Sequence, residues 1–141
     1  PLSQMSYTRR TGTRKVKEYN SADTLSAGEL CQFDEAGEII SAVTAKGVLG
    51  IALAAATSST TVLVDILSPG DEVKCNSITG TMGASEIGNE VDLSTGGLAV
   101  TLTESNGDAI ITGWDGATTT ELYCTFKNLA YGSPGAGVET T

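Results

Sequence analysis

The clearest pattern of hydrophobic and polar positions lies in residues 47–75. Apolar runs rich in β-branched residues alternate there with short polar or Pro-Gly segments, which is typical of neighbouring antiparallel strands. We therefore expect three strands that pair in chain order and form the centre of the domain. The segments are an apolar strand over Val48–Ala55, a turn over Thr57–Thr60, a strand over Thr61–Leu67, a Pro69-Gly70 turn and a strand that starts at Glu72.

The middle strand of this region carries large apolar residues at both alternating sets of positions. Val62, Val64 and Ile66 would lie on one face of the sheet, because side chains alternate along a strand. Leu63 and Leu67 would then lie on the other face. The pattern predicts a strand that is covered on both sides.

Similar short strands are predicted before and after this region, with Gly, Asn, Asp or Ser between them. Strands at intervals of roughly 8–12 residues indicate an all-β fold, either a small β-barrel or a β-sandwich. A polar, glycine-rich stretch over Asn76–Ser85 is expected to be a loop or an irregular strand. The further strands are Ala27–Phe33, Glu38–Val43, Ile87–Leu93, Leu98–Thr103, Ala109–Trp114 and Glu121–Phe126.

Two turns are specific enough to predict hairpins. Asp34–Gly37 separates the first two of these strands, so that Leu30 would lie on one face and Cys31 on the other. Asn106-Gly107 is a dipeptide favoured in two-residue hairpins, so we expect the strands before and after it to pair directly.

Charge divides the chain unevenly. The formal net charge is −9, with eight Lys and Arg residues against seventeen Asp and Glu residues, and five of the eight basic residues fall in the first 17 positions. Residues 1–22 also carry no sustained apolar period, and the end of the chain is rich in Gly, so we expect three parts: an extended basic N-terminal arm over residues 1–22, a β body over 23–130, and a Gly-rich C-terminal tail over 131–141.

The N-terminal arm is the predicted partner-binding element. A basic arm on an acidic body is suited to docking on a partner, and the arm could be held by a neighbouring chain or fold back on its own domain. We expect no nucleic-acid partner, because the acidic body would repel phosphates. No apolar run approaches the roughly 18–20 residues that span a bilayer, so no membrane partner is expected either. The candidate partner-binding residues of the arm are Tyr7, Arg9, Arg10, Arg14, Lys15 and Lys17.

The chain contains no histidine, which removes the usual activation of Ser and Cys nucleophiles and most zinc sites. Phosphate-binding glycine motifs are also missing, and the paired carboxylates fall in turns or on polar strand faces. We predict no enzymatic activity, no catalytic or metal-ligating residue and no cofactor. Cys31, Cys75 and Cys124 lie in apolar strands and are expected to be buried free thiols.

Trp114, next to Asp115, admits two interpretations. An exposed indole beside a carboxylate could stack on a sugar ring and bind it. Alternatively, Trp114 anchors the core or a subunit contact, which is the interpretation we favour because a sugar-binding platform would need further aromatic residues.

Taken in order, these strand motifs resemble the small head-decoration, or capsid cement, proteins of tailed bacteriophages. The resemblance covers roughly residues 22–128 and excludes the basic arm and the tail. The segments that carry it are Ala27–Leu30, Gly37–Ala42, Val48–Ala56, Val62–Val64, Gly88–Leu93, Thr112–Asp115 and Leu122–Phe126.

The resemblance implies a structural virion protein on the outer surface of a capsid assembled in the host cytoplasm. Its partners would be the major capsid protein, whose adjacent subunits it would clamp, and further copies of itself in a homotrimer. The alternative from a different class is a carbohydrate-binding or host-attachment β module, for which Trp114 is the candidate residue.

Overall fold

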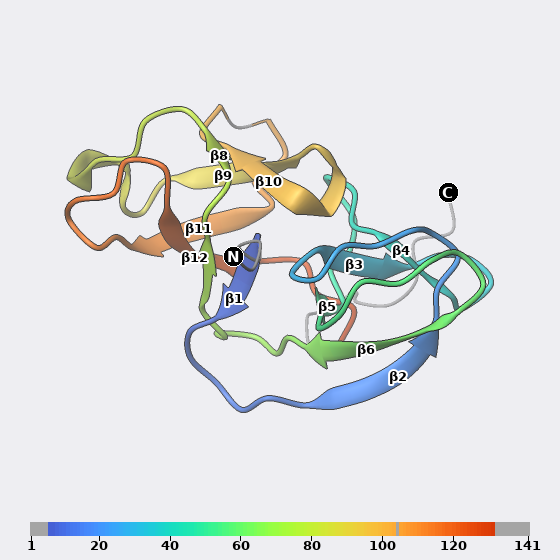
Figure 1. Ribbon diagram of the computed structural model, residues 1–141. Coiled ribbons are helices and arrows are strands. Elements are labelled where there is room, and N and C mark those ends of the chain that lie inside the picture. Colours follow the sequence, from blue (N-terminus) through green and yellow to red (C-terminus); the bar gives the residue numbers. More distant parts are fainter. Residues whose placement is uncertain (1–5, 104, 132–141) are drawn as a thin grey trace.

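The computed structural model describes residues 6–103 and 105–131, and it shows an all-β domain of two sheets packed as a sandwich (Figure 1). The seven-stranded sheet has the order β1-β7-β12-β11-β9-β10-β8, and the five-stranded sheet has the order β2-β6-β5-β3-β4. Strands of the first sheet are β1 (Tyr7–Arg9), β7 (Val73–Cys75), β8 (Ile78–Thr79), β9 (Glu90–Ser94), β10 (Ala99–Thr101), β11 (Ala109–Gly113) and β12 (Leu122–Phe126). Strands of the second are β2 (Val16–Asn20), β3 (Leu30–Phe33), β4 (Ile39–Ser41), β5 (Gly50–Ala52) and β6 (Thr61–Ile66). Two 3₁₀ turns, Ala84–Glu86 and Gly96–Leu98, complete the described elements.

The main core lies between the sheets and is built by the alternation of side chains along each strand. Leu30 on β3 and Ile51 on β5 face Val91 on β9 and Ile111 on β11, and all four are almost fully buried. A second, smaller core covers the opposite face of the five-stranded sheet and includes Cys31. Leu30 and Cys31 therefore lie on opposite faces, as predicted.

The hairpin predicted at Asp34–Gly37 is confirmed. β3 and β4 pair antiparallel with Phe33 opposite Ile39. The carboxylate of Asp34 accepts hydrogen bonds from the backbone N–H groups of Ala36 at 2.8 Å and Glu38 at 2.9 Å. An Asp side chain that holds the turn backbone in this way explains why the chain reverses here.

The strands of residues 47–75 pair only in part as predicted. β5 and β6 are antiparallel neighbours, but β7 belongs to the other sheet, so the prediction that β6 and β7 pair was wrong. The turn between them explains the crossing: the Asp71 carboxylate accepts a hydrogen bond from the Ser68 N–H at 2.9 Å, and the chain leaves toward the seven-stranded sheet. The prediction that the strand over Thr61–Leu67 is covered on both sides holds at Leu67, which is buried in the main core, and was wrong at Leu63, whose side chain is 46% exposed.

The hairpin predicted at Asn106-Gly107 was wrong. β10 and β11 are not neighbours, because β9 lies between them in the sheet. The backbone N–H groups of Ser105, Asn106 and Gly107 instead surround the carboxylate of Asp92 at distances of 2.7–3.1 Å. The Asn106-Gly107 dipeptide thus donates backbone hydrogen bonds to a buried carboxylate and does not form a two-residue hairpin.

The N-terminal arm is not a free extension in its described part. β1 pairs with β7 at the edge of one sheet, and β2 pairs with β6 at the edge of the other. Residues 6–22 therefore belong to the folded body and join its two sheets. Of the two alternatives for the arm, the structure has the one in which the arm folds back on its own domain. The predicted Gly-rich tail lies outside the described residues, apart from Tyr131.

Candidate contact surface

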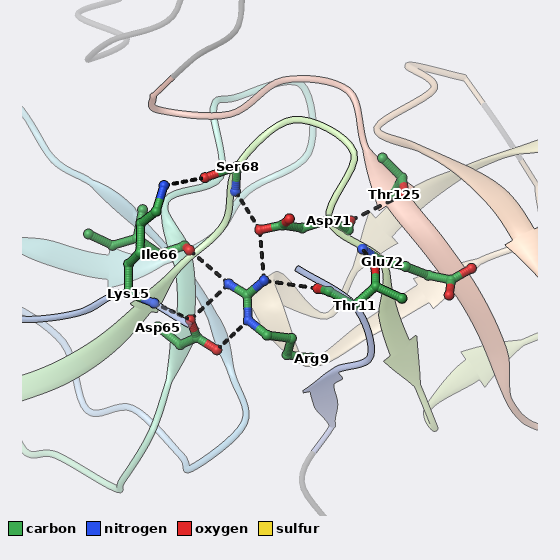
Figure 2. A network of polar contacts seen from close by, with 9 residues as sticks. All are labelled: Arg9, Thr11, Lys15, Asp65, Ile66, Ser68, Asp71, Glu72 and Thr125. Carbon is green, nitrogen blue, oxygen red and sulfur yellow. Dashed lines mark hydrogen bonds and ion pairs between the residues drawn. The ribbon is translucent and has the colours of Figure 1, made fainter. Parts of the chain in front are cut away.

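The N-terminal segment is fixed to the body by one arginine, Arg9 at the end of β1 (Figure 2). Its guanidinium donates to both carboxylate oxygens of Asp65 on β6, from Nε at 3.0 Å and from Nη2 at 2.8 Å. It also donates to the Asp71 carboxylate at 2.7 Å and to the carbonyl oxygens of Thr11 and Ile66 at 3.0 and 2.9 Å. These five bonds use the full donor capacity of the side chain.

This arginine connects the two sheets. β1 belongs to the seven-stranded sheet and β6 to the five-stranded sheet, so the bidentate pair of Arg9 and Asp65 joins strands that share no backbone hydrogen bonds. The two side chains are only 11% and 3% exposed. A buried pair of this kind is stable because the geometry is bidentate and the remaining donors are satisfied.

Two of the residues predicted to bind a partner are therefore occupied inside the domain. Arg9 is used by the contact just described. Tyr7 is fully buried in the main core, where its ring packs against Phe126 with the centroids 6.0 Å apart. Their assignment to a partner surface is corrected: β1 directs its first and third side chains inward, toward the other sheet.

Arg10 lies on the opposite, outer face of the seven-stranded sheet. It forms an ion pair with Glu72 at 2.5 Å, and its guanidinium carbon lies 3.9 Å from the centre of the Tyr123 ring. Burial raises the pKa of Glu72, but hydrogen bonds from the Thr112 hydroxyl and from Arg10 outweigh it and hold this pKa below its ordinary value. The Arg10 side chain is 46% exposed, so it remains accessible from solvent.

The other basic residues of the arm lie around the connection from β1 to β2. The Lys15 ammonium donates to the Ser68 hydroxyl at 3.2 Å, and the Lys17 ammonium lies 5.4 Å from the centre of the Tyr19 ring. Arg14 is exposed and forms no ion pair within the part of the chain that the structure describes. Of the six predicted arm residues, Tyr7 and Arg9 are therefore used inside the domain. The other four, Arg10, Arg14, Lys15 and Lys17, are exposed.

Trp114 anchors its own loop and packs against the main core. Its indole N–H donates to the Thr118 carbonyl oxygen at 2.9 Å. The neighbouring Asp115 carboxylate accepts from the N–H groups of Ala117 and Thr118, both at 2.8 Å. The indole N–H of Trp114 and Oδ1 of Asp115 are therefore engaged within this loop.

An uncovered part of a sheet face was missed from the sequence. The seven-stranded sheet ends at β1, and beyond it the inward-facing side of β6 and β2 is covered at Asp65 but open to solvent further along. Leu63 on β6 and Val16 on β2 are 46% and 47% exposed there. A groove of about 410 Å³ adjoins them between the β1–β2 segment and β5, and its lining includes Arg14, Ile51, Leu53 and Asp65. We call Val16, Leu53, Leu63 and Arg14 the open face.

The sequence contained a signal for one part of this arrangement. Asp65 is the single charged residue in the otherwise apolar run Val62–Leu67. A lone carboxylate in a strand expected to be buried requires a cationic or hydrogen-bonding partner, which the structure supplies as Arg9. The open face had no comparable signal, because exposure of Leu63 depends on where the other sheet ends.

The remaining candidate chemistry is structural. Cys31, Cys75 and Cys124 are buried free thiols, as predicted. No group of three His, Cys, Asp or Glu residues in the described part of the chain is placed to hold a metal ion. Likewise, none of the described helices is long and apolar enough to cross a membrane.

Comparison of the chain with the known protein families gives no match, and a search of curated proteins gives none.

Proposed function

We propose that this chain is a structural virion protein that binds the outer surface of a phage capsid and stabilises it by clamping adjacent major capsid protein subunits. The observation that supports this most is the ordered set of strand motifs that resembles the head-decoration proteins. Within the structure these motifs fall in chain order on β3, β4, β5, β6, β9, β11 and β12 of one sandwich, and none lies in a separate unit.

The ion pairs of Arg9 are consistent with a clamp. A clamp must resist deformation while its contacts are loaded, and Arg9 on β1 joins the two sheets through its ion pair with Asp65 on β6. Repetition over a closed lattice converts modest contacts at each site into a large total binding free energy. We further propose self-association as a homotrimer, which would multiply the contacts that each decoration unit makes.

The carbohydrate-binding alternative has less support. The indole N–H of Trp114 already donates to Thr118, and Oδ1 of Asp115 already accepts two backbone bonds, so a sugar could use these atoms only by displacing those bonds. Displacing made hydrogen bonds lowers the affinity that stacking could give. The proposal therefore remains with capsid binding.

The test is co-sedimentation with expanded heads prepared without this protein. Saturable binding at a fixed ratio to the major capsid protein, with greater resistance of the heads to heat, is the expected result. Binding to a glycan array that Trp114→Ala abolishes, without binding to heads, would contradict the proposal. Deletion of residues 1–17 is not a suitable variant, because it removes β1 and Arg9 and would unfold the domain.

A further inference from the structure

The edge of the five-stranded sheet beside the open face carries backbone groups that have no hydrogen-bond partner within residues 6–103 and 105–131. β2 is the end strand of that sheet, with β6 as its neighbour. The bonds from the Ile66 N–H to the Lys15 carbonyl and from the Ser21 N–H to the Thr60 carbonyl fix which residues face β6. By alternation, the backbone groups of Val16 and Glu18 point outward. From Ser21 onward the edge is closed by a bridge to Ile39 on β4.

The open face and this edge form one continuous surface. The Val16 side chain is part of the open face, while its N–H and C=O point away from β6 along the edge. A strand added here would form backbone bonds to Val16 and Glu18 and place apolar side chains beside Val16, on the face that also carries Leu63. An unpaired strand edge next to exposed apolar side chains is a template for strand addition.

Charge complementarity selects the chemistry of the added strand. The first 20 residues contain five basic residues and one acidic residue, whereas the rest of the chain contains three basic and sixteen acidic residues. Arg9 and Arg10 are already paired with carboxylates of the body, so Arg14 is the basic residue that the open face offers, with Glu18 beside Leu63 on the same face. Arg14 lines its groove without an ion pair among the described residues. A carboxylate on the incoming strand would supply the missing counter-charge.

A second copy of this chain is a poor occupant. Antiparallel pairing of two β2 strands through their outward groups would place Glu18 opposite Glu18 in one register and Lys17 opposite Lys17 in the next; a third register places Lys17 opposite Lys15, although it also places Glu18 opposite Arg14. Like charges directly opposite one another destabilise a strand pair. These like-charge pairs favour a strand from a different protein as the occupant, and a second copy is an outcome that the test distinguishes.

We propose that the open face and the β2 edge dock an extended, acidic segment of the major capsid protein, which adds to the five-stranded sheet beside Val16 and Glu18. This inference rests on the proposed function and specifies where and how the capsid is bound. Figure 1 shows β2 at the outer side of its sheet, beside β6 and away from the seven-stranded sheet, so an incoming strand can approach it.

The test compares matched variants for binding to expanded heads prepared without this protein. Glu18→Pro removes one outward N–H without touching the bonds to β6, and edge strands tolerate proline; Glu18→Ala is its control. Val16→Ser removes an exposed apolar contact, and Val43→Ser is its control because Val43 is 45% exposed elsewhere. Arg14→Glu reverses the charge in the groove. Circular dichroism establishes that each variant is folded.

We expect Glu18→Pro, Val16→Ser and Arg14→Glu each to weaken head binding roughly tenfold or more, since each removes at least one contact made on binding. The two controls should bind within about twofold of the wild type. Hydrogen exchange in the peptide covering residues 15–21 should slow when heads are bound. If Glu18→Pro does not fold, the Val16 and Arg14 variants decide alone.

Three outcomes overturn the inference. If the wild type binds heads and all three variants bind with the same affinity, this surface is not the docking site, although the proposal of capsid binding stands. A failure of the wild type to bind heads would remove both proposals. A wild-type dimer that Glu18→Pro dissociates would identify a second copy as the occupant in place of the capsid strand.

Discussion

Arg9 and Asp65 form a bidentate ion pair across the two sheets, with Nε–Oδ2 and Nη2–Oδ1 distances of 3.0 and 2.8 Å. The residues are 56 positions apart, so the pair forms only when both sheets are assembled. It lies at the boundary between the main core and the open face. The same contact therefore closes the core and positions the segment that leads to β2.

Replacing Arg9 should strongly destabilise the domain. Arg9→Met leaves the carboxylates of Asp65 and Asp71 buried without their counter-charge, which costs about 3 kcal/mol or more of the free energy of unfolding. Urea denaturation measures this loss. Arg14→Met is the control, because Arg14 is exposed, and it should change stability by less than about 0.5 kcal/mol. Equal stability of the two variants would contradict a structural role for Arg9.

Sequence reasoning predicted the fold class and most strands because alternation is a local property. Leu30 and Cys31 occupy opposite faces for that reason alone. Alternation does not reveal what covers a face, and for this reason the exposure of Leu63 was not predicted. The same limit applies to β7, whose pattern identifies a strand but not the sheet that contains it.

The candidate site was predicted less well than the fold. Basic residues near a terminus were all assigned to a partner, although a strand directs alternate residues inward and outward. Tyr7 and Arg9 point toward the core while Arg10 points outward, and knowing this required the pairing of β1 with β7. The lone Asp65 was the one available sign that a basic residue was needed inside.

Asp92 should make stability depend on pH in the acid range. Burial raises its pKa, but bonds from the N–H groups of Asn106, Ser105 and Gly107 outweigh burial and lower the pKa below its ordinary value. A lowered carboxyl pKa contributes stability above the unfolded value of about 3.9, and this contribution is lost as pH falls through the folded value. Asp92→Asn should therefore cost about 1–3 kcal/mol at neutral pH and less near pH 3.

Urea denaturation at the two pH values measures this difference. Glu35→Gln is the control, because Glu35 is an exposed turn residue and its loss should matter little at either pH. A cost of Asp92→Asn that stays constant between the two pH values would show that the carboxylate charge is not what the three N–H groups stabilise.

The cysteines should be unreactive in the folded protein. Burial, with a smaller effect of Glu29, raises the pKa of Cys31 to about 12, and burial also raises the pKa of Cys75 and Cys124. Because the thiolate is the reactive form, a disulfide reagent at pH 8 should modify none of them within minutes. All three should react after denaturation in guanidinium. Rapid modification of native protein would indicate an opening of the core that the structure does not contain.

Gly50 is required by the close approach of β5 to β6. A Cβ atom at this position would lie 2.1 Å from the carbonyl oxygen of Asp65, which is the residue that holds Arg9. Gly50→Ala must therefore push β6 away and disturb the ion pair as well as the strand pairing, so we expect a loss of about 3 kcal/mol in urea denaturation. Gly83→Ala is the control, since its Cβ would meet nothing within 4 Å. If Gly50→Ala were as stable as Gly83→Ala, the packing of β5 against β6 described above would be wrong.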